Sequence, residues 1–537
     1  MALVSGFALV ALLFYEPYQQ PISGDRAYLI YVAQALYRGE PIYQTTTAGY
    51  TPLGYLFSAG AMHLGVMLGL PTYLAPRLLS LPISALSCGL LFLVASQATR
   101  NARIGLVAAL SLLHIELFAL LGTSNLEQKT LVQFAFLCAT WAAQKRKWVW
   151  AGVAVALAAM VWQPALLGAL AIFIVCLGNS RRRPANLLLY GSGLFLGTVP
   201  AGAYLILTGQ EVDFVQQAVL FKILPRRHVV LQELTHPVTF GAISLSAVGA
   251  RNLPLVVMMV GALLKFLRRG FHSVLRLSFS TRMGAIVWLT VLAAVYVIGS
   301  PLTGIEYNGQ VDLLAFMYLP AFWGAWGWYL LFDSIVWRFK QRGVAALSPS
   351  VFMSVLAVSL AASVLLAASG NRIVEPLSAQ EEFVRRLIAE GSESSPLAIN
   401  ADEFYVLSET RSPWRTRHVT PYFLDFMAYR ERRECTDVLA DLKQEEYSPV
   451  LIGSRRLWEN PCLERILAYF RDGGEFFEVN VESTVRQCGT LRLVQAQLAN
   501  RTWDGAALAT RLRCVLEQSS RRNALVNYSN YTIFTRE

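Results

Sequence analysis

Long apolar runs separated by short polar segments dominate the first 370 residues of the chain. A helix that crosses a bilayer needs about 20 mostly apolar residues, and eleven runs approach that length. We predict spans at roughly 2–15, 74–97, 104–121, 130–144, 148–164, 165–179, 187–207, 253–267, 283–300, 311–332 and 349–369. The pattern predicts a polytopic α-helical membrane domain over residues 1–370.

Basic residues gather in every second connection between these runs. They are Arg100, Arg103, Lys145, Arg146, Lys147, Arg181, Arg182, Arg183, Lys265, Arg268, Arg269, Arg276, Arg282, Arg338, Lys340 and Arg342. The alternate connections hold most of the carboxylates, namely Glu16, Asp25, Glu40, Glu127, Glu211, Asp213, Glu233 and Glu306. Short cytoplasmic loops are enriched in Lys and Arg. We therefore expect a multi-pass protein of the cell (inner) membrane, with its N-terminus in the cytoplasm and residues 371–537 outside.

Composition supports this division of the chain. Of the 537 residues, 55% are hydrophobic and 15% are charged, whereas soluble domains carry about 25% charged residues. This excludes an ordinary soluble enzyme and a disordered protein. Residues 371–537 hold 22 Lys+Arg and 24 Asp+Glu, and the first 370 hold 24 and 11. The formal charge of +11 therefore reflects membrane topology and contact with membrane lipids. No nucleic-acid-binding motif accompanies it.

The C-terminal segment, residues 371–537, alternates short strand-like and helix-like patterns. Strands are expected at 396–400, 418–423, 449–454 and 475–481, and helices at 381–390, 435–446 and 462–472. This alternation predicts an extracytoplasmic soluble α/β domain with a mostly parallel sheet, which would cap a membrane cavity and help to select an acceptor. Its four cysteines allow either disulfides or free buried thiols. They are Cys435, Cys462, Cys488 and Cys514.

Two outer connections are too long to be simple turns. The first outer loop covers residues 16–72, and another long loop covers 208–252. Loops of this length usually carry function or structure of their own. Within the first loop, apolar spacing predicts helices at 25–37 and 51–68, both suited to the membrane interface.

The first outer loop also holds the leading candidate for chemistry, Asp25. An aspartate at a helix start can serve only as an N-cap, or it can serve as a catalytic base. Six tyrosines share the loop, and they suit either an interfacial aromatic belt or a wall on which sugars stack. They are Tyr28, Tyr31, Tyr37, Tyr43, Tyr50 and Tyr55.

Beyond Asp25 the loop continues as Ala33-Gln34-Ala35-Leu36-Tyr37-Arg38-Gly39-Glu40-Pro41-Ile42-Tyr43, and later as Pro52-Leu53-Gly54-Tyr55. An early carboxylate followed by A-x-x-L-x-x-G-x-P-x-Y and Pro-Leu-x-Tyr resembles the type C (GT-C) glycosyltransferase superfamily. Within that superfamily the pattern resembles bacterial protein mannosyltransferase-like and aminoarabinose transferase-like enzymes. The resemblance covers the whole architecture.

The resemblance implies transfer of a sugar from a polyprenyl-phosphate carrier to a glycan, lipid or protein acceptor on the outer face. In an inverting transfer Asp25 would remove the acceptor proton, while cations stabilise the leaving phosphate. Outer-face cations, with one histidine beside them, are candidates for that contact, although a basic run also suits lipid headgroups and Arg77 also suits snorkelling. They are Arg26, Arg77, Lys129, Lys222, Arg226, Arg227 and His228.

Further candidates for substrate binding lie at the ends of later spans or within the tyrosine-rich loop. They are Tyr43, Tyr55, Asn125, Glu127, Gln163, Glu306 and Tyr307. Asn125 and Glu127 equally suit a capped helix start, and Gln163 suits a turn. The first outer loop lacks a D-x-D motif, so we expect no metal cofactor; a divalent cation held by loop carboxylates is the alternative.

Two other functions fit parts of the pattern. A lipid or glycan transporter or flippase would show charged or broken helices near the midplane and paired halves. Here the carboxylates gather at one face and no internal repeat is found. A glycan polymerase or ligase of similar topology would rely on basic residues in a late outer loop, and the segment 222–236 keeps that alternative open.

Overall fold

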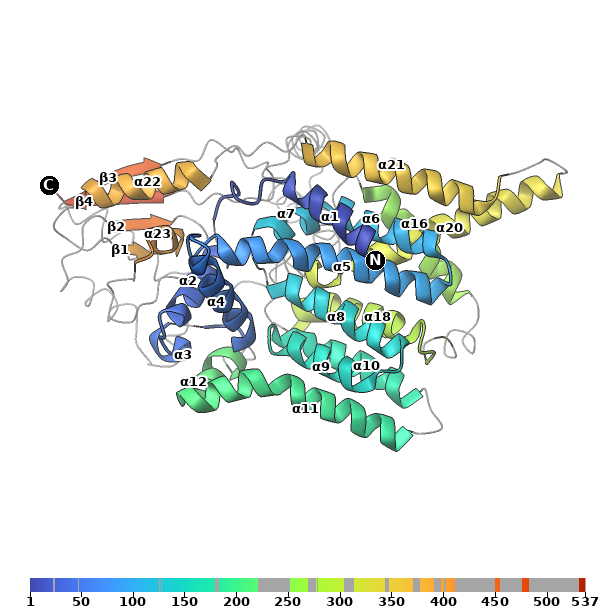
Figure 1. The fold of residues 1–537 in the computed structure, drawn as a ribbon, viewed down its shortest axis with the longest axis horizontal. Helices are drawn as coiled ribbons and strands as arrows, with labels where there is room; N and C mark the ends of the chain where they lie inside the picture. The colour runs from blue at the N-terminus through green and yellow to red at the C-terminus, as the bar shows by residue number, and fades with distance from the viewer. Residues whose placement is uncertain are drawn as a thin grey trace, which may run out of the picture.

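The computed structural model describes residues 1–22, 25–46, 48–124, 126, 128–178, 183–220, 252–268, 277, 279–303, 313–342, 347–369, 377–390, 397–399, 402–410, 450–453, 476–481 and 531–536. Each of the eleven predicted apolar runs contains a helix. The helices are α1 (Ala2–Leu13), α5 (Ala75–Thr99), α6 (Ala102–His114), α7 (Glu116–Ser124), α8 (Gln128–Gln144), α9 (Trp148–Ala159), α10 (Leu166–Gly178), α11 (Arg183–Thr208), α16 (Leu253–Leu267), α18 (Gly284–Thr303), α20 (Tyr318–Gln341) and α21 (Pro349–Ser369). In Figure 1 most of them run lengthwise and side by side.

Among the described helices, not every one is long and apolar enough by itself to cross a bilayer. Within the described ranges, Ala75–Thr99, Pro184–Thr208 and Pro349–Ser369 are each long and apolar enough to cross a bilayer. The pair α6 and α7, bent by 66° at Ile115, makes a fourth if it counts as one span. These helices support a multi-pass membrane protein, and the count of eleven spans stays a prediction.

His114, at the break between α6 and α7, is held by Asn252, the residue before α16, and by Ser363 on α21. The amide of Asn252 donates to the His114 carbonyl (3.3 Å), and its Oδ1 lies 2.7 Å from His114 Nδ1. Ser363 on α21 meets the other ring nitrogen at 2.9 Å. A broken helix inside a membrane protein needs such partners, because lipid offers its free backbone groups none. Asn252 and Ser363 therefore help to fix the bend.

The two predicted helices of the first outer loop are present. They are α2 (Asp25–Tyr37) and α4 (Pro52–Met67), with the short α3 (Ile42–Thr45) between them. Pro52 sits in the first turn of α4, where a missing N–H costs nothing. After α11 the chain forms α12 (Glu211–Phe214) and the π-helical turn η2 (Val215–Leu220). Figure 1 shows α2, α3, α4 and α12 together at one end of the long helices.

The described part of the C-terminal segment lies at that same end. It contains α22 (Leu377–Glu390), α23 (Asp402–Ser408), β1 (Leu397–Ile399), β2 (Val450–Gly453), β3 (Phe476–Val481) and β4 (Tyr531–Arg536). The strands form one sheet in the order β1-β2-β4-β3. Among the described strands only β1 and β2 pair in parallel, because β4 inserts antiparallel between β2 and β3.

The expectation of a mostly parallel sheet is therefore wrong for the described strands. The missed strand β4 reverses the direction of pairing. The strand expected at 418–423, the helices expected at 435–446 and 462–472, and the cysteines Cys435, Cys462, Cys488 and Cys514 lie outside the described residues. The domain boundary at residue 370 stays a prediction.

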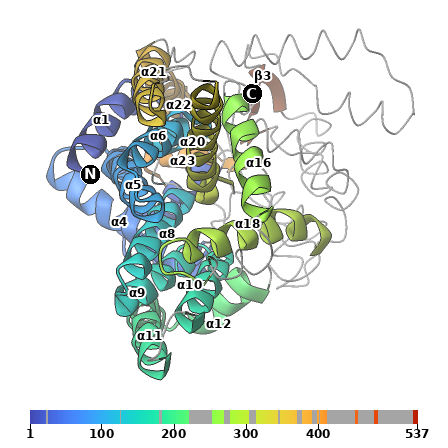
Figure 2. The same cartoon turned by 90° about the vertical axis from the view of Figure 1, so that its right-hand side faces the viewer.

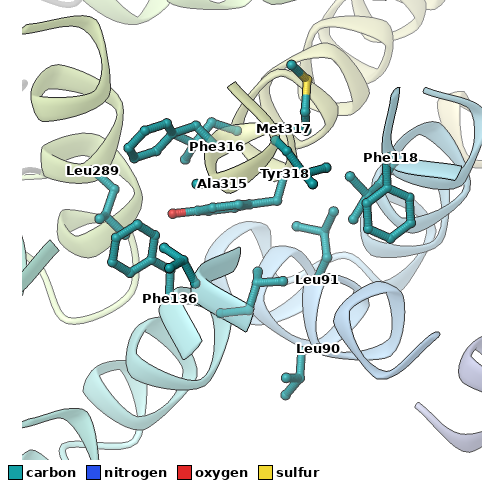
Figure 3. Packing of buried hydrophobic residues seen from close by; sticks show 14 of the residues in the cluster. Leu90, Leu91, Phe118, Phe136, Leu289, Ala315, Phe316, Met317 and Tyr318 are labelled. Carbon is teal, nitrogen blue, oxygen red and sulfur yellow. The ribbon is translucent and has the colours of Figure 1, made fainter. Parts of the chain in front are cut away.

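The main core joins side chains from many helices. Figure 3 shows Leu90 and Leu91 of α5, Phe118 of α7 and Phe136 of α8 around Phe316 and Tyr318. Phe316 belongs to the 3₁₀ turn η4 (Leu314–Phe316) that precedes α20. The long helices are thereby fixed relative to one another beneath the first outer loop.

Helices α9 and α11 approach through glycines, and they lie side by side in both Figure 1 and Figure 2. A Cβ atom on Gly193 would strike the carbonyl of Val149. One on Gly197 would lie 2.7 Å from the Val153 carbonyl. Small residues four apart let helix backbones pack closely in membranes. The contact between α9 and α11 thus depends on these glycines.

We expect Gly193→Val to destabilise the protein by about 1–3 kcal/mol, the usual cost of overpacking. Gly191→Val, two residues away on α11, adds the same side chain where nothing lies within 4 Å and should change stability little. Thermal unfolding of the purified protein in detergent compares the two. Equal effects would show that the close glycine contact does not form.

Candidate functional site

The candidate base stands at the start of a helix that other elements hold in place. Asp25 is the first residue of α2, and its side chain lies outside the described residues. Ala27, Ile30 and Ala33, on later turns, are buried in a small core cluster. Arg26 is half-buried and lies close enough to Arg77 for their charges to repel. The beginning of α2 therefore lies next to concentrated positive charge.

Glutamine side chains from distant segments bond to the backbone of the first outer loop. Gln380 on α22 accepts from the Ile22 N–H (2.9 Å) and donates to the Ile22 carbonyl (3.1 Å). Gln217 on η2 accepts from the Ala48 N–H (3.0 Å) and donates to the Tyr43 carbonyl (2.5 Å). An amide side chain both donates and accepts, so each glutamine replaces a backbone partner.

Two more glutamines form hydrogen bonds with the backbone in the middle of the loop. Gln210 accepts from the Tyr43 N–H (2.8 Å). Gln163, in the 3₁₀ turn η1 (Gln163–Ala165), donates to the carbonyls of Gly49 (3.3 Å) and Ala218 (2.8 Å). The amide nitrogen of Gln163, a predicted substrate contact, is thus bonded to backbone in this structure. We call Gln163, Gln210, Gln217 and Gln380 the glutamine clasp.

Arg77 fixes the beginning of the same loop. Its side chain is 0% exposed, and Nη1 donates to the carbonyl of Pro17 (2.9 Å) and to that of Gln20. Snorkelling, the alternative considered for this residue, does not describe a fully buried guanidinium. Its Nε and Nη2 atoms are buried without a hydrogen-bond partner. The guanidinium thus keeps unused donors beside α2.

The predicted tyrosine wall is largely inside the protein. The Tyr43 hydroxyl donates to the Tyr50 carbonyl (2.6 Å), and the Tyr28 hydroxyl accepts from the Gly49 N–H (2.9 Å). The hydroxyls of Tyr55 and Tyr28 lie 3.4 Å apart. Burial raises the pKa values of Tyr43 and Tyr55 well above their ordinary value, so both phenols stay protonated as donors. Tyr43 and Tyr55 therefore support the loop from within.

Lys129 lies on α8 beneath the loop. It is 1% exposed, and its Nζ stands 5.0 Å from the ring centre of Tyr50 and 5.9 Å from that of Trp162. A cation over an aromatic face is stabilised by the ring quadrupole. The structure thus keeps a second buried cation close to the tyrosine cluster.

The C-terminal segment forms hydrogen bonds with the end of the first outer loop. The Thr72 N–H and hydroxyl donate to Glu409 (3.1 and 2.7 Å), and the Tyr73 hydroxyl donates to Glu381 (2.6 Å). The amide of Gln34 on α2 donates to Thr72 Oγ1 (2.8 Å). Gln34 also donates to the Val406 carbonyl on α23 (3.1 Å), so α22 and α23 help to determine where α2 lies.

Several predicted site residues lie outside the described residues. They are Asn125, Glu127, Lys222, Arg226, Arg227, His228, Glu306 and Tyr307. Within the described part of the chain, no group of three or more His, Cys, Asp or Glu side chains could hold a metal ion. The expectation of metal independence stays a prediction.

Sequence reasoning missed the residues that hold the loop together. Gln34, Gln210, Gln217 and Gln380 each bond to a segment remote in sequence. Hydropathy does not mark them as buried, because glutamine is mostly found on exposed surfaces. The one usable signal is the length of the loop, whose buried irregular backbone must find partners somewhere.

Comparison with solved structures gives a clear fold match. The chain resembles ArnT from Cupriavidus metallidurans bound to undecaprenyl phosphate, with 11% identity, 85% of this chain and 94% of that chain covered, and a TM-score of 0.54. The apo form of the same protein matches with 12% identity, 85% and 93% coverage, and a TM-score of 0.56.

An Archaeoglobus fulgidus oligosaccharyltransferase in complex with Zn and sulfate matches at a TM-score of 0.48, with 10% identity, covering 99% of this chain and 88% of that chain. No family model and no curated protein sequence matches. The predicted resemblance to aminoarabinose transferase-like GT-C enzymes is confirmed at the level of the fold.

We expect Gln217→Leu to lower the free energy of unfolding by about 1–3 kcal/mol, because it leaves a buried N–H and carbonyl unpaired. Gln216→Leu, at the half-buried neighbouring position, should have a much smaller effect. Thermal unfolding in detergent distinguishes them. An unchanged midpoint for Gln217→Leu would contradict the role given to the clasp.

The contact between Tyr73 and Glu381 should make stability sensitive to alkali. Burial, and then the hydrogen bond to Glu381, raise the pKa of Tyr73 above its ordinary value. The folded protein therefore holds this proton more tightly than the unfolded chain. The resulting stability is fully present below about pH 10 and is lost as pH rises beyond that value.

We expect the unfolding midpoint of Tyr73→Phe to fall less steeply than that of the wild type between about pH 9 and 11. Tyr18→Phe, at an exposed tyrosine, is the matched control. Parallel pH profiles for wild type and Tyr73→Phe would contradict the assignment.

Proposed function

We propose that the protein is a glycosyltransferase. It moves a sugar from a polyprenyl-phosphate-linked donor to an acceptor on the extracytoplasmic face of the cell (inner) membrane, with inversion at the anomeric carbon. Asp25 acts as the general base. The acceptor is a glycan, a lipid or a protein.

The fold shared with ArnT carries this proposal. That relative is bound to undecaprenyl phosphate, and the alignment covers 94% of its chain. A polyprenyl phosphate is the group released when a polyprenyl-phosphate sugar is transferred. The same fold in this chain supports a lipid partner of the same chemical class.

The residues at the first outer loop suit the chemistry. The acceptor O–H gives its proton to the Asp25 carboxylate, and its oxygen bonds to the anomeric carbon as the bond from that carbon to the phosphate oxygen breaks. The electron pair of the broken bond stays on the phosphate. A positioned base of this kind typically contributes about 10²- to 10⁴-fold to the rate.

Positive charge must face the leaving phosphate, where negative charge develops. Arg26 and Arg77 lie near the start of α2, and Lys129 lies beneath the loop. Arg77 retains unbonded Nε and Nη2 atoms, which suit a phosphate oxygen. We propose these three side chains as phosphate contacts, with Lys222, Arg226, Arg227 and His228 as further candidates in the loop that follows η2.

Other residues are proposed to receive the acceptor and the sugar. Asn125 and Glu127 precede α8, and Glu306 and Tyr307 follow α18. The C-terminal segment grips the first outer loop through α22 and α23, which supports a role in capping the site and selecting the acceptor. A divalent cation is an alternative that the transfer assay can test by adding a chelator.

Sugar transfer from synthetic polyprenyl-phosphate sugars by the purified protein tests the proposal. We expect wild type to release polyprenyl phosphate and Asp25→Asn to lose about 10²- to 10⁴-fold of that rate while it still folds and binds donor. Glu211→Gln, at an exposed outer carboxylate, should keep full activity.

Full activity in Asp25→Asn would overturn the assignment of the base and direct attention to Glu127 or Glu306. Absence of turnover over a broad panel of donors, together with lipid movement in liposomes, would overturn the enzyme in favour of a transporter.

A further inference from the structure

One face of α8 holds buried polar side chains that have no hydrogen-bond partner. Thr130 and Gln133 are 1% and 0% exposed, and the Thr130 hydroxyl and both amide atoms of Gln133 are unbonded. Lys129 lies four residues before Gln133, so helical spacing places it on the same face. This face therefore combines a cation, a hydroxyl and an amide.

Aromatic rings cluster next to Lys129 and Phe136 of α8. Trp162, which contacts Lys129, packs against Tyr296 and Phe316 with ring centres 5.5 and 6.3 Å away. Phe136, three residues beyond Gln133, stacks on Phe316 at 5.9 Å. Figure 3 shows Tyr318 beside Phe136 and Phe316.

The unbonded groups weaken the protein in its unliganded form. A buried amide or hydroxyl without a partner loses its contacts with water and gains none in return. A leucine at position 133 would fill similar space without this cost. Neutral polar groups that cost stability are therefore best explained by a ligand that bonds to them.

The chemistry of the face identifies the class of ligand. An amide can accept from one hydroxyl and donate to another, and aromatic rings cover the apolar C–H faces of a sugar ring. Gln133 lies about 6 Å farther along the helix axis than Lys129, so one cation-bound phosphate and an attached sugar can reach both. The phosphate would neutralise Lys129, and Thr130 and Gln133 are neutral, so burying an additional charge beside them would be unfavourable.

We propose that Thr130 and Gln133 bind the hydroxyl groups of a neutral sugar on the lipid donor, with Lys129 at the phosphate. This rests on the proposed function and adds the sugar subsite and its preference for an uncharged sugar. Donors that carry an amino sugar or a uronic acid should bind more weakly than donors that carry a neutral hexose.

Lipid binding to the full-length protein in detergent tests the assignment. The probes are polyprenyl phosphate and polyprenyl-phosphate mannose, measured with wild type and Gln133→Leu. We expect the variant to lose about tenfold in affinity for the mannose-bearing lipid, as for one or two hydrogen bonds, and to keep its affinity for polyprenyl phosphate. Its unfolding midpoint without lipid should rise, because a buried unbonded amide is removed.

Gln144→Leu is the matched control on the same helix. The Gln144 amide nitrogen donates to the carbonyls of Val94 (3.1 Å) and Arg282 (2.9 Å). Its replacement should lower the unfolding midpoint and leave the affinities for both lipids unchanged. The opposite stability effects of the two glutamine variants separate a ligand contact from a structural role.

Three results would overturn the inference. Equal losses for both lipids would assign Gln133 to the phosphate or prenyl chain, and no loss for either, with a lower midpoint, would make it structural. Equal affinity of the wild type for the two lipids would show that the sugar makes no contact. Selective loss of mannose-lipid binding without any sugar transfer by the wild type would instead refute the proposed enzyme and leave the sugar site standing.

Discussion

The structure depends on one constraint, namely that buried irregular backbone needs hydrogen-bond partners. The first outer loop lies against the ends of the long helices, and parts of its backbone outside α2 and α4 find their hydrogen-bond partners in other segments. An unpaired buried N–H or carbonyl costs about as much as a lost hydrogen bond. The glutamine clasp and Arg77 supply these partners from η1, the turn around η2, α22 and α5. The loop is thereby ordered by segments that are remote in sequence.

This constraint connects the fold to the proposed chemistry. A base and a leaving-group contact must be held within a fraction of an ångström of their working positions. The helix that begins with Asp25 is tied to α5 by Arg77 before it and to the C-terminal segment by Gln34 within it. Some buried polar groups nevertheless remain without a hydrogen-bond partner, in Arg77 and on the face of α8. We propose that those groups contact the lipid donor.

Hydropathy and spacing could predict the helices but not their contacts. The helices expected at 25–37 and 51–68 form at Asp25–Tyr37 and Pro52–Met67, because apolar spacing and a proline at a helix start are local signals. The bend at Ile115 and the antiparallel insertion of β4 were missed, because each depends on partners far away in the chain. Gln163 was noticed as a polar residue near a span, but its use for two backbone carbonyls is a tertiary property. The aromatic residues of the loop were expected to form either an exposed wall or a membrane belt, and Tyr43 and Tyr55 are instead buried supports.

The central claim is that side chains from outside the first outer loop impose its order, and hydrogen–deuterium exchange in Gln380→Leu measures this directly. Gln380 bonds to both backbone groups of Ile22, three residues before Asp25. The account predicts faster exchange of the Ile22 amide and of the first turn of α2, with exchange in α9 and α11 unchanged. Exchange in the first turn of α2 that matches the wild type would contradict it.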